Sequence, residues 1–108
     1  MTVSLVNTKI VELHCNASDW LALWQAFTAI VKQLDGVTII NSITHEFPNG
    51  GGTGLILLSE SHAAIHTWIE HDYIWCELAT CGDVADLTRF ESLLLELQVN
   101  HPPQSLDT

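Results

Sequence analysis

The chain has 108 residues, of which 47% are apolar, and its 3 basic and 13 acidic side chains give a formal net charge of −10 at pH 7. This length suits one domain over residues 1–108, and the charge excludes most nucleic-acid binders, whose phosphate partners require cations, while it suits a cationic small molecule. No apolar run reaches the roughly 20 residues of a membrane span, and the cysteines are too sparse for a disulfide framework, so we expect a cytoplasmic protein without a membrane partner.

The first part of the chain predicts a strand followed by a helix. Residues 8–15 alternate between apolar and polar side chains, which is typical of a strand. Ser18 or Asp19 is then available as an N-cap. Apolar residues recur at helical spacing from Trp20 to Leu34, and Gly36 is expected to end this helix.

The middle of the chain predicts strands. Residues 37–47 are rich in β-branched side chains, and the glycine-rich turn 48–52 separates them from the apolar run 53–61. Two further strands are expected over 62–68 and 73–81.

A second helix closes the chain. Asp83 or Asp86 can cap it, and the buried stripe is expected to comprise Leu87, Phe90, Leu94 and Leu97. The resulting order, β-α-β-β-β-β-α, predicts an α+β fold, a two-layer α/β sandwich with both helices on one face of a largely antiparallel sheet. The other face would lie bare, so a homodimer is expected.

Residues 59–68, SESHAAIHTW, hold the densest group of reactive side chains. His62 and His66 have the i, i+4 spacing of a helical zinc site. They lie in a predicted strand, however, and no third ligand follows at a characteristic spacing, so no metal is predicted. Taken alone, they are ordinary strand histidines.

Several spaced motifs in this region resemble the prokaryotic S-adenosylmethionine decarboxylase proenzymes. The matching segments are Glu60-Ser61-His62, Ile65-His66-Thr67-Trp68 with Glu70, and Thr80-Cys81-Gly82, preceded by the glycine loop in HEFPNGGGTG, residues 45–54. The matches span about residues 45 to 83 in one register.

The resemblance implies that the chain cleaves itself between Glu60 and Ser61, into 1–60 and 61–108. Ser61 would attack the carbonyl carbon of Glu60 to form an ester, and β-elimination would leave a pyruvoyl group at position 61. His66 is the implied base for the Cα proton, and Thr53 is the implied hydroxyl that supports processing. Strand alternation puts Ser61 and His66 on opposite faces, so a turn or bulge near 60–62 is required, and it would strain the scissile bond.

The resemblance also implies a pyruvoyl-dependent decarboxylase that feeds spermidine and polyamine biosynthesis. The pyruvoyl group would bind the substrate amine as a Schiff base, and Cys81 would return a proton to the substrate. Phe47 is implied to stack on the adenine and Glu70 to bind the ribose. Without the resemblance, Phe47 could equally be a core residue and Glu70 a solvated surface residue. A carbonyl cofactor made from the chain itself also suits this sequence. Its two lysines, Lys9 and Lys32, lie in no segment that is typical of a lysine that binds pyridoxal phosphate.

Three departures from the family pattern fall near the expected substrate pocket. Ile69 stands where proline is usual, Trp75 and Glu77 are bulky where small residues and aspartate are usual, and Gly52 replaces a β-branched residue. Two alternatives therefore stay open. The same chemistry could act on arginine or ornithine, or the chain could be a non-catalytic dimerisation partner.

Overall fold

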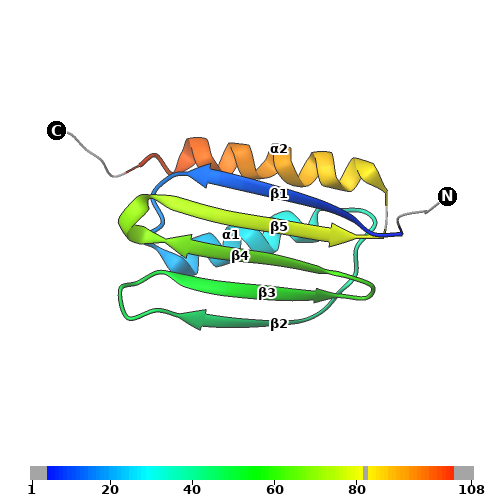
Figure 1. Cartoon of the computed structure of the whole chain (residues 1–108), viewed down its shortest axis with the longest axis horizontal. Coiled ribbons are helices and arrows are strands. Elements are labelled where there is room, and N and C mark those ends of the chain that lie inside the picture. Colours follow the sequence, from blue (N-terminus) through cyan, green and yellow to red (C-terminus); the bar gives the residue numbers. More distant parts are fainter. Residues whose placement is uncertain (1–4, 82, 104–108) are drawn as a thin grey trace.

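The computed structural model describes residues 5–81 and 83–103, and within them the chain forms a five-stranded sheet and two α-helices (Figure 1). Every neighbouring pair of strands is antiparallel, and the order across the sheet is β1-β5-β4-β3-β2. The strands are β1 (Asn7–His14), β2 (Ile39–Glu46), β3 (Gly52–Leu58), β4 (His62–Trp68) and β5 (Tyr73–Thr80). The helices are α1 (Trp20–Lys32) and α2 (Val84–Asn100), and a short 3-10 turn occupies Ile69–His71.

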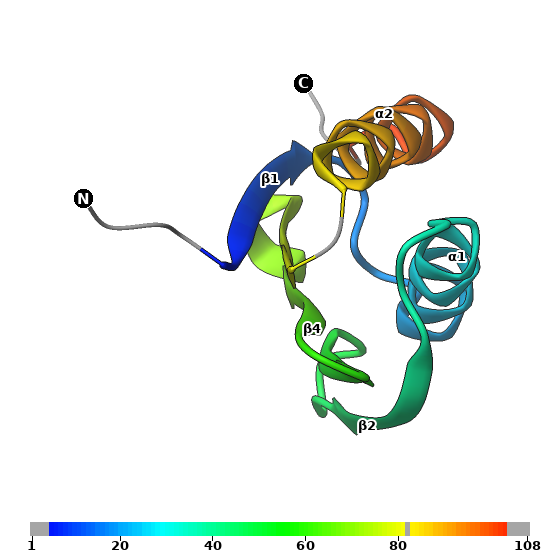
Figure 2. The ribbon, with the colours of Figure 1, turned by 90° about the vertical axis from the view of Figure 1, so that its right-hand side faces the viewer.

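Both helices cover the same face of the curved sheet (Figure 2). This confirms the predicted α+β sandwich and the predicted element order. Among the described residues, none of the helices is both long enough and apolar enough to span a membrane.

The caps of the helices follow from two aspartates. Asp19 Oδ1 accepts a hydrogen bond from the Ala22 N–H, and Asp83 Oδ1 accepts one from the Ala85 N–H. Each capping carboxylate satisfies a backbone donor that the first helical turn leaves unpaired. The predicted stripe of α2 is buried.

Asp86 and Gly36 have different roles from those predicted. Asp86 is 5% exposed, and its carboxylate accepts hydrogen bonds from the N–H groups of Asp35 (3.2 Å) and Gly36 (2.9 Å). Helix α1 ends at Lys32, before Gly36. Gly36 lacks a side chain because a Cβ there would lie 2.5 Å from Asp86 Oδ2. These contacts tie the loop after α1 to the start of α2.

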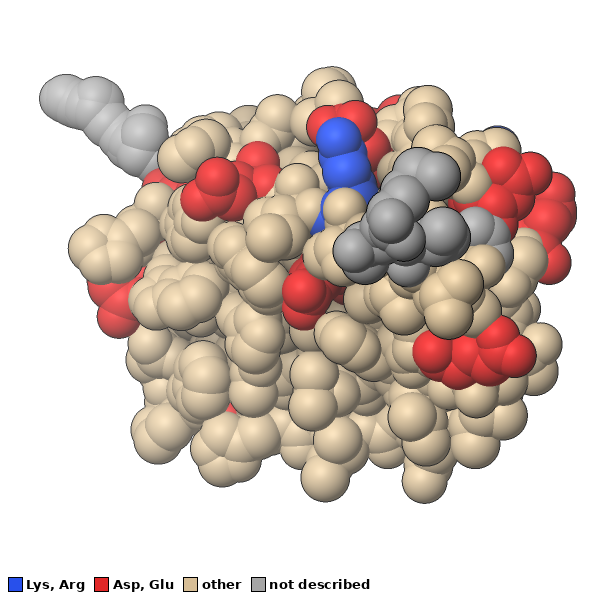
Figure 3. Space-filling model, turned by 45° about the vertical axis from the view of Figure 1, so that its right-hand side comes forward, with Lys and Arg blue, Asp and Glu red and all other residues tan. Residues whose placement is uncertain are grey.

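The core lies between the sheet and the helices, where Cys15 and Cys76 are fully buried, as predicted. The opposite side of the sheet, called here the open face, is exposed. Its outward apolar side chains are Ile10, Ile43, Leu55, Leu57 and Trp68. Figure 3 shows a broad area without charged side chains in the lower half of the view, the height at which Figure 1 has β2 and β3. The second face of the sheet is therefore bare in the single chain, as expected.

Two tryptophans of α1 pack directly on strand β3. The rings of Trp20 and Trp24 stack with centroids 5.7 Å apart. A Cβ on Gly52 would lie 2.6 Å from Trp20 Cδ2, and one on Gly54 would overlap the Trp24 ring. The absence of a β-branched residue at Gly52 therefore has a local cause, which is the close approach of an indole ring.

Candidate active site

The peptide bond between Glu60 and Ser61 lies in a bend that joins β3 to β4. The predicted strand 53–61 is too long, because β3 ends at Leu58. The Leu58 N–H donates to the Ser61 carbonyl (2.9 Å), and the Ser59 N–H donates to the Thr38 carbonyl (3.0 Å). The turn required near 60–62 is thus present.

The expected strain is not found in the φ angles of this bend. Among the described residues, a φ in the left-handed region occurs only at Gly50 and Asp72. Ordinary backbone hydrogen bonds hold the bend, so it needs no such angle.

Cys81 lies beside this bend because β5 pairs with β4. The register aligns Ala79 with His62, so the residues just beyond these two strands end close together. The Cys81 Sγ–H donates a hydrogen bond to Oε1 of Glu60. Glu60, Ser61 and Cys81 line a pocket of about 140 Å³, together with Gly36, Val37, Thr38, Leu58, Ser59 and Thr80. Gly82, the last residue of the T-C-G motif, lies outside the described residues.

The three cysteines differ in exposure. Cys81 is exposed, and its hydrogen bond to Glu60 is the main cause that raises its thiol pKa. Burial raises the pKa of Cys15 to about 11, and burial also raises the pKa of Cys76. A buried thiol without a cation beside it stays protonated and unreactive. Cys81 is therefore the cysteine that can take part in chemistry.

His66 and Thr53 form a cross-strand pair on the open face, between β4 and β3. Thr53 Oγ1 lies 2.5 Å from His66 Nδ1, and the same hydroxyl donates its proton to the Ile65 carbonyl at 3.3 Å. Since a hydroxyl has one proton, Thr53 can accept a hydrogen bond from the Nδ1–H tautomer of His66 while it donates to the Ile65 carbonyl. This tautomer leaves a lone pair on His66 Nε2, as a general base requires.

Phe47 and Glu70 lie near His66. A hollow of about 480 Å³ is lined by Phe47, Pro48, Asn49, His66, Thr67, Trp68 and Glu70. Phe47 is half-buried, and its N–H donates to the Gly51 carbonyl (2.7 Å) across the glycine loop. Glu70 is exposed in the 3-10 turn after β4. An aromatic ring and a solvated carboxylate thus flank one hollow.

The predicted site residues form two groups at opposite ends of the sheet. Ser61 directly precedes β4 and His66 lies five residues further on, so a strand rise of about 3.3 Å per residue separates them by about 16 Å. Glu60, Ser61 and Cys81 make up what we call the cleavage-bend cluster. Thr53, His66, Phe47 and Glu70 make up the histidine cluster. A single protomer does not bring the two clusters together.

His62 and His66 do not form a metal site. They lie on the same face of β4, two alternations apart, and His62 Nε2 faces Glu77 Oε1 at 3.3 Å. Over residues 5–81 and 83–103 there is no group of three or more histidine, cysteine, aspartate or glutamate side chains suited to a metal ion.

The sequence placed Trp75 near the expected substrate pocket without predicting its contact with His66, and it gave no sign of Thr38. Trp75 pairs with His66 across β4 and β5, with ring centroids 5.5 Å apart. Thr38 holds the cleavage bend through its backbone carbonyl. The bulk of Trp75 was visible in the sequence, but a backbone carbonyl leaves no trace in side-chain identity.

Comparison with known proteins identifies the family. Residues 10–101 match the family model described as S-adenosylmethionine decarboxylase. The chain belongs to the S-adenosylmethionine decarboxylase family. It is 54% identical over 78 residues to an S-adenosylmethionine decarboxylase proenzyme of Synechococcus sp. (strain WH7803), covering 68% of this chain and 60% of that relative. A proenzyme of the same name from Prochlorococcus marinus (strain MIT 9211) is 42% identical over 90 residues, covering 81% and 74% of the two chains.

A solved structure has the same fold as this chain. The crystal structure of the adenosylmethionine decarboxylase from Aquifex aeolicus VF5 matches with a TM-score of 0.79 and 26% identity, over 98% of this chain and 88% of that one. The chain spans 55% and 60% of the length of two of its curated relatives, from Prochlorococcus marinus (strain MIT 9313) and from the Synechococcus strain. The resemblance in the sequence motifs is confirmed as family membership.

Proposed function

We propose that this member of the S-adenosylmethionine decarboxylase family is a pyruvoyl-dependent decarboxylase of S-adenosylmethionine that supports polyamine biosynthesis. The observation that carries the proposal is the cleavage-bend cluster, in which the Glu60–Ser61 peptide shares a pocket with the exposed Cys81 thiol. The free cysteines also suit a reducing cytoplasm.

Self-cleavage would make the reactive group from the chain itself. Ser61 Oγ attacks the Glu60 carbonyl carbon, and the C–N bond breaks to give an ester and a free amine at residue 61. His66 Nε2 removes the Cα proton of residue 61, and the Cβ–Oγ bond breaks to release the Glu60 carboxylate. Water then replaces the nitrogen of the dehydroalanine that remains, and ammonia leaves.

The residues present fit a pyruvoyl group at position 61. The pocket of about 140 Å³ has room for a three-carbon group. Neither lysine provides an amine in this pocket that could bind a separate carbonyl cofactor. Lys9 Nζ pairs with Glu91 at 3.2 Å, and Lys32 lies in the last turn of α1. A pyruvoyl carbonyl supplies the electron sink that amino-acid decarboxylation needs.

The other site residues would bind the substrate and move protons. The Cys81 thiol returns a proton to the substrate carbon after carbon dioxide leaves. Phe47 stacks on the adenine, and the Glu70 carboxylate accepts hydrogen bonds from the ribose hydroxyls. The excess of carboxylates over cations favours the sulfonium charge of S-adenosylmethionine.

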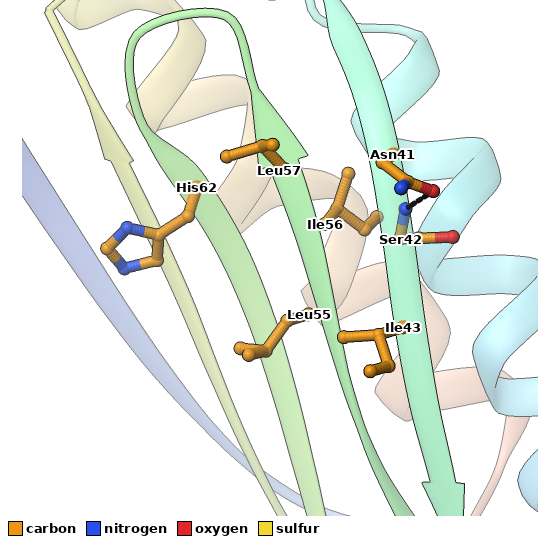
Figure 4. Close-up of a pocket in the computed structure, with 7 residues that line it drawn as sticks. All are labelled: Asn41, Ser42, Ile43, Leu55, Ile56, Leu57 and His62. Carbon is orange, nitrogen blue, oxygen red and sulfur yellow. Dashed lines mark hydrogen bonds between the residues drawn. The ribbon is translucent and has the colours of Figure 1, made fainter.

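The proposal includes a homodimer whose open faces meet. On the open face, a hollow of about 550 Å³ lies over β2, β3 and the start of β4, with the side chains of Ile43, Leu55 and Leu57 around it (Figure 4). Such an apolar area favours a partner surface. A two-fold axis that runs the facing strands in opposite directions brings the histidine cluster of one copy to the cleavage-bend cluster of the other. Each complete site would then use both protomers.

Intact-mass analysis and carbon dioxide release test this function. We expect two fragments, 1–60 and 61–108, with the second carrying pyruvoyl in place of serine. The mature protein should release carbon dioxide from S-adenosylmethionine and not from arginine or ornithine. Ser61→Ala is the control, and it should stay uncleaved and inactive. An intact wild-type chain after long incubation, or turnover of arginine alone, would overturn the proposal.

A further inference from the structure

We infer that Glu60 has a second role beyond supplying the carbonyl at the cleavage site, in which its side-chain carboxylate holds the Cys81 thiol protonated and in position. The inference deepens the proposed function and rests on it for the role of Cys81 as a proton donor. Glu60 would act as a positioning residue through Cys81, both before and after the chain is cut.

The geometry of the bend sets this contact. Glu60 stands between two anchored neighbours, since the Ser59 N–H is bound to the Thr38 carbonyl and the Ser61 carbonyl is bound to the Leu58 N–H. Cys81 follows directly after Thr80, the last residue of β5. The thiol is the donor and Glu60 Oε1 the acceptor, so the hydrogen bond exists only while sulfur carries its proton.

The charges around Cys81 favour the same protonation state. Glu60 is the charged residue among those lining the pocket. Two other nearby carboxylates are engaged with backbone amides, Asp83 with Ala85 and Asp86 with Asp35 and Gly36. The side chain of Asp35 is exposed in the adjoining loop. A carboxylate beside a thiol, with no cation lining the described part of the pocket, raises the thiol pKa.

Chain cleavage would leave this arrangement in place. Glu60 becomes the last residue of fragment 1–60, and the bond from Ser59 N–H to the Thr38 carbonyl lies wholly within that fragment. The new α-carboxylate of Glu60 adds a second negative charge near the sulfur. Glu60, as the new C-terminus of fragment 1–60, would thus stay part of the site and keep the Cys81 thiol protonated.

Alkylation of Cys81 by iodoacetamide tests the inference without requiring activity. The measurement uses the uncleaved Ser61→Ala protein, with intact mass as the readout and Cys81→Ser to assign the label. Glu60→Gln keeps the size and the acceptor oxygen but removes the charge. Only the thiolate reacts with iodoacetamide. We therefore expect Glu60→Gln to raise the alkylation rate of Cys81 near neutral pH by at least about threefold and to move the rate–pH profile to lower pH.

Matched variants keep the test decisive. Glu96→Gln removes one exposed charge about 18 Å along α2 from its first turn, at about 1.5 Å per residue, and should leave the profile unchanged. Glu60→Asp keeps the charge, and its profile should lie between those of wild type and Glu60→Gln. An unchanged profile in Glu60→Gln, or in Glu60→Asp if the first variant does not fold, would overturn the inference. The proposed function fails on different evidence, namely an uncut wild-type chain or one that releases no carbon dioxide.

Discussion

The Thr53 hydroxyl decides which nitrogen of His66 can act as a base. When its proton goes to the Ile65 carbonyl, the hydroxyl can accept a hydrogen bond from His66 Nδ1–H. That arrangement leaves the lone pair on Nε2, the ring nitrogen that does not contact Thr53. One threonine therefore contacts the imidazole and can favour the tautomer that a general base requires.

Replacing His66 tests this role directly. In His66→Ala, the acyl shift should still occur but elimination should stall, because general bases typically contribute about a hundred- to ten-thousand-fold. Hydroxylamine attacks esters much faster than amides, so it should cut this variant between residues 60 and 61, as seen by intact mass. His14→Ala, at an exposed histidine on β1, should mature normally. Wild-type maturation in a folded His66→Ala protein would rule out the role.

Tyr73 gives a spectroscopic test of the open face, because it is the single tyrosine of the chain. Its hydroxyl donates to Glu12 Oε2, and this hydrogen bond is the main cause that raises the pKa of Tyr73 to about 12. The raised pKa stabilises the fold below the ordinary tyrosine pKa of about 10, and this stabilisation is lost as the pH rises through about 12.

Phenolate absorbance measured against pH checks this expectation. Glu12→Gln should move the single titration step to lower pH, since the charge is gone and the acceptor is weaker. Glu46→Gln, an exposed glutamate on β2, should leave it in place. An ordinary tyrosine midpoint in the wild-type protein would contradict the assigned contact.

At the scale of elements, the joint between α1 and β3 depends on two glycines. Strand interiors usually disfavour glycine, yet Gly52 and Gly54 both face tryptophan rings from α1. The close approach lets the helix pack two indoles against the sheet, that of Trp20 buried and that of Trp24 partly buried. Thr53, which pairs with His66 across β3 and β4, lies between these two glycines.

Gly54→Ala should destabilise the fold by overpacking, by about 1 to 3 kcal/mol. The measurement is urea unfolding in the uncleaved Ser61→Ala background, so that maturation does not complicate the transition. Trp24→Leu in the same chain should recover part of the loss, because it removes the ring that the new methyl group meets. Equal stability of the Gly54→Ala protein and its parent would show that this contact relaxes freely.

The sequence predicted most elements well because they bury one face, although β2 has no buried side chain. The helical stripes of α1 and α2 and the alternation in β1 came from apolar periodicity, whereas β2 was predicted from its β-branched residues and β3 from an apolar run. The turn near 60–62 was required by the expected chemistry, but its anchor was hidden, because this anchor is the backbone carbonyl of Thr38, about twenty residues earlier. Motif resemblance supplied Ser61, His66 and Cys81 as a set, but it carried no information on which of them meet within one protomer.

At the scale of the whole molecule, the two clusters argue for a shared site. The cleavage-bend cluster and the histidine cluster lie about 16 Å apart along β4, too far for His66 to reach Ser61 of its own chain. The open face between them is apolar and exposed. In the proposed homodimer, a second copy that covers this face would bring its own His66 to Ser61.

Mixing two inactive variants tests the shared site. Ser61→Ala lacks the nucleophile and His66→Ala lacks the base, but a mixed dimer has one site with both. Co-refolded in equal amounts before maturation, they should recover about a quarter of wild-type activity, since half of the dimers are mixed and one of their two sites is complete. Either variant alone should stay inactive. No recovery, in mixed dimers verified by two different tags, would contradict a shared site.

The strand order β1-β5-β4-β3-β2 has a consequence for the cut protein. Fragment 1–60 would hold β1, β3 and β2, and fragment 61–108 would hold the β4–β5 hairpin between β1 and β3. The shorter chain is interleaved with the longer one, so it cannot leave until the ladders on both of its flanks break. Maturation would therefore turn the folding of each protomer from a one-chain into a two-chain reaction, which makes its melting temperature depend more strongly on protein concentration. Once fully separated, the two chains would have to find each other again by diffusion.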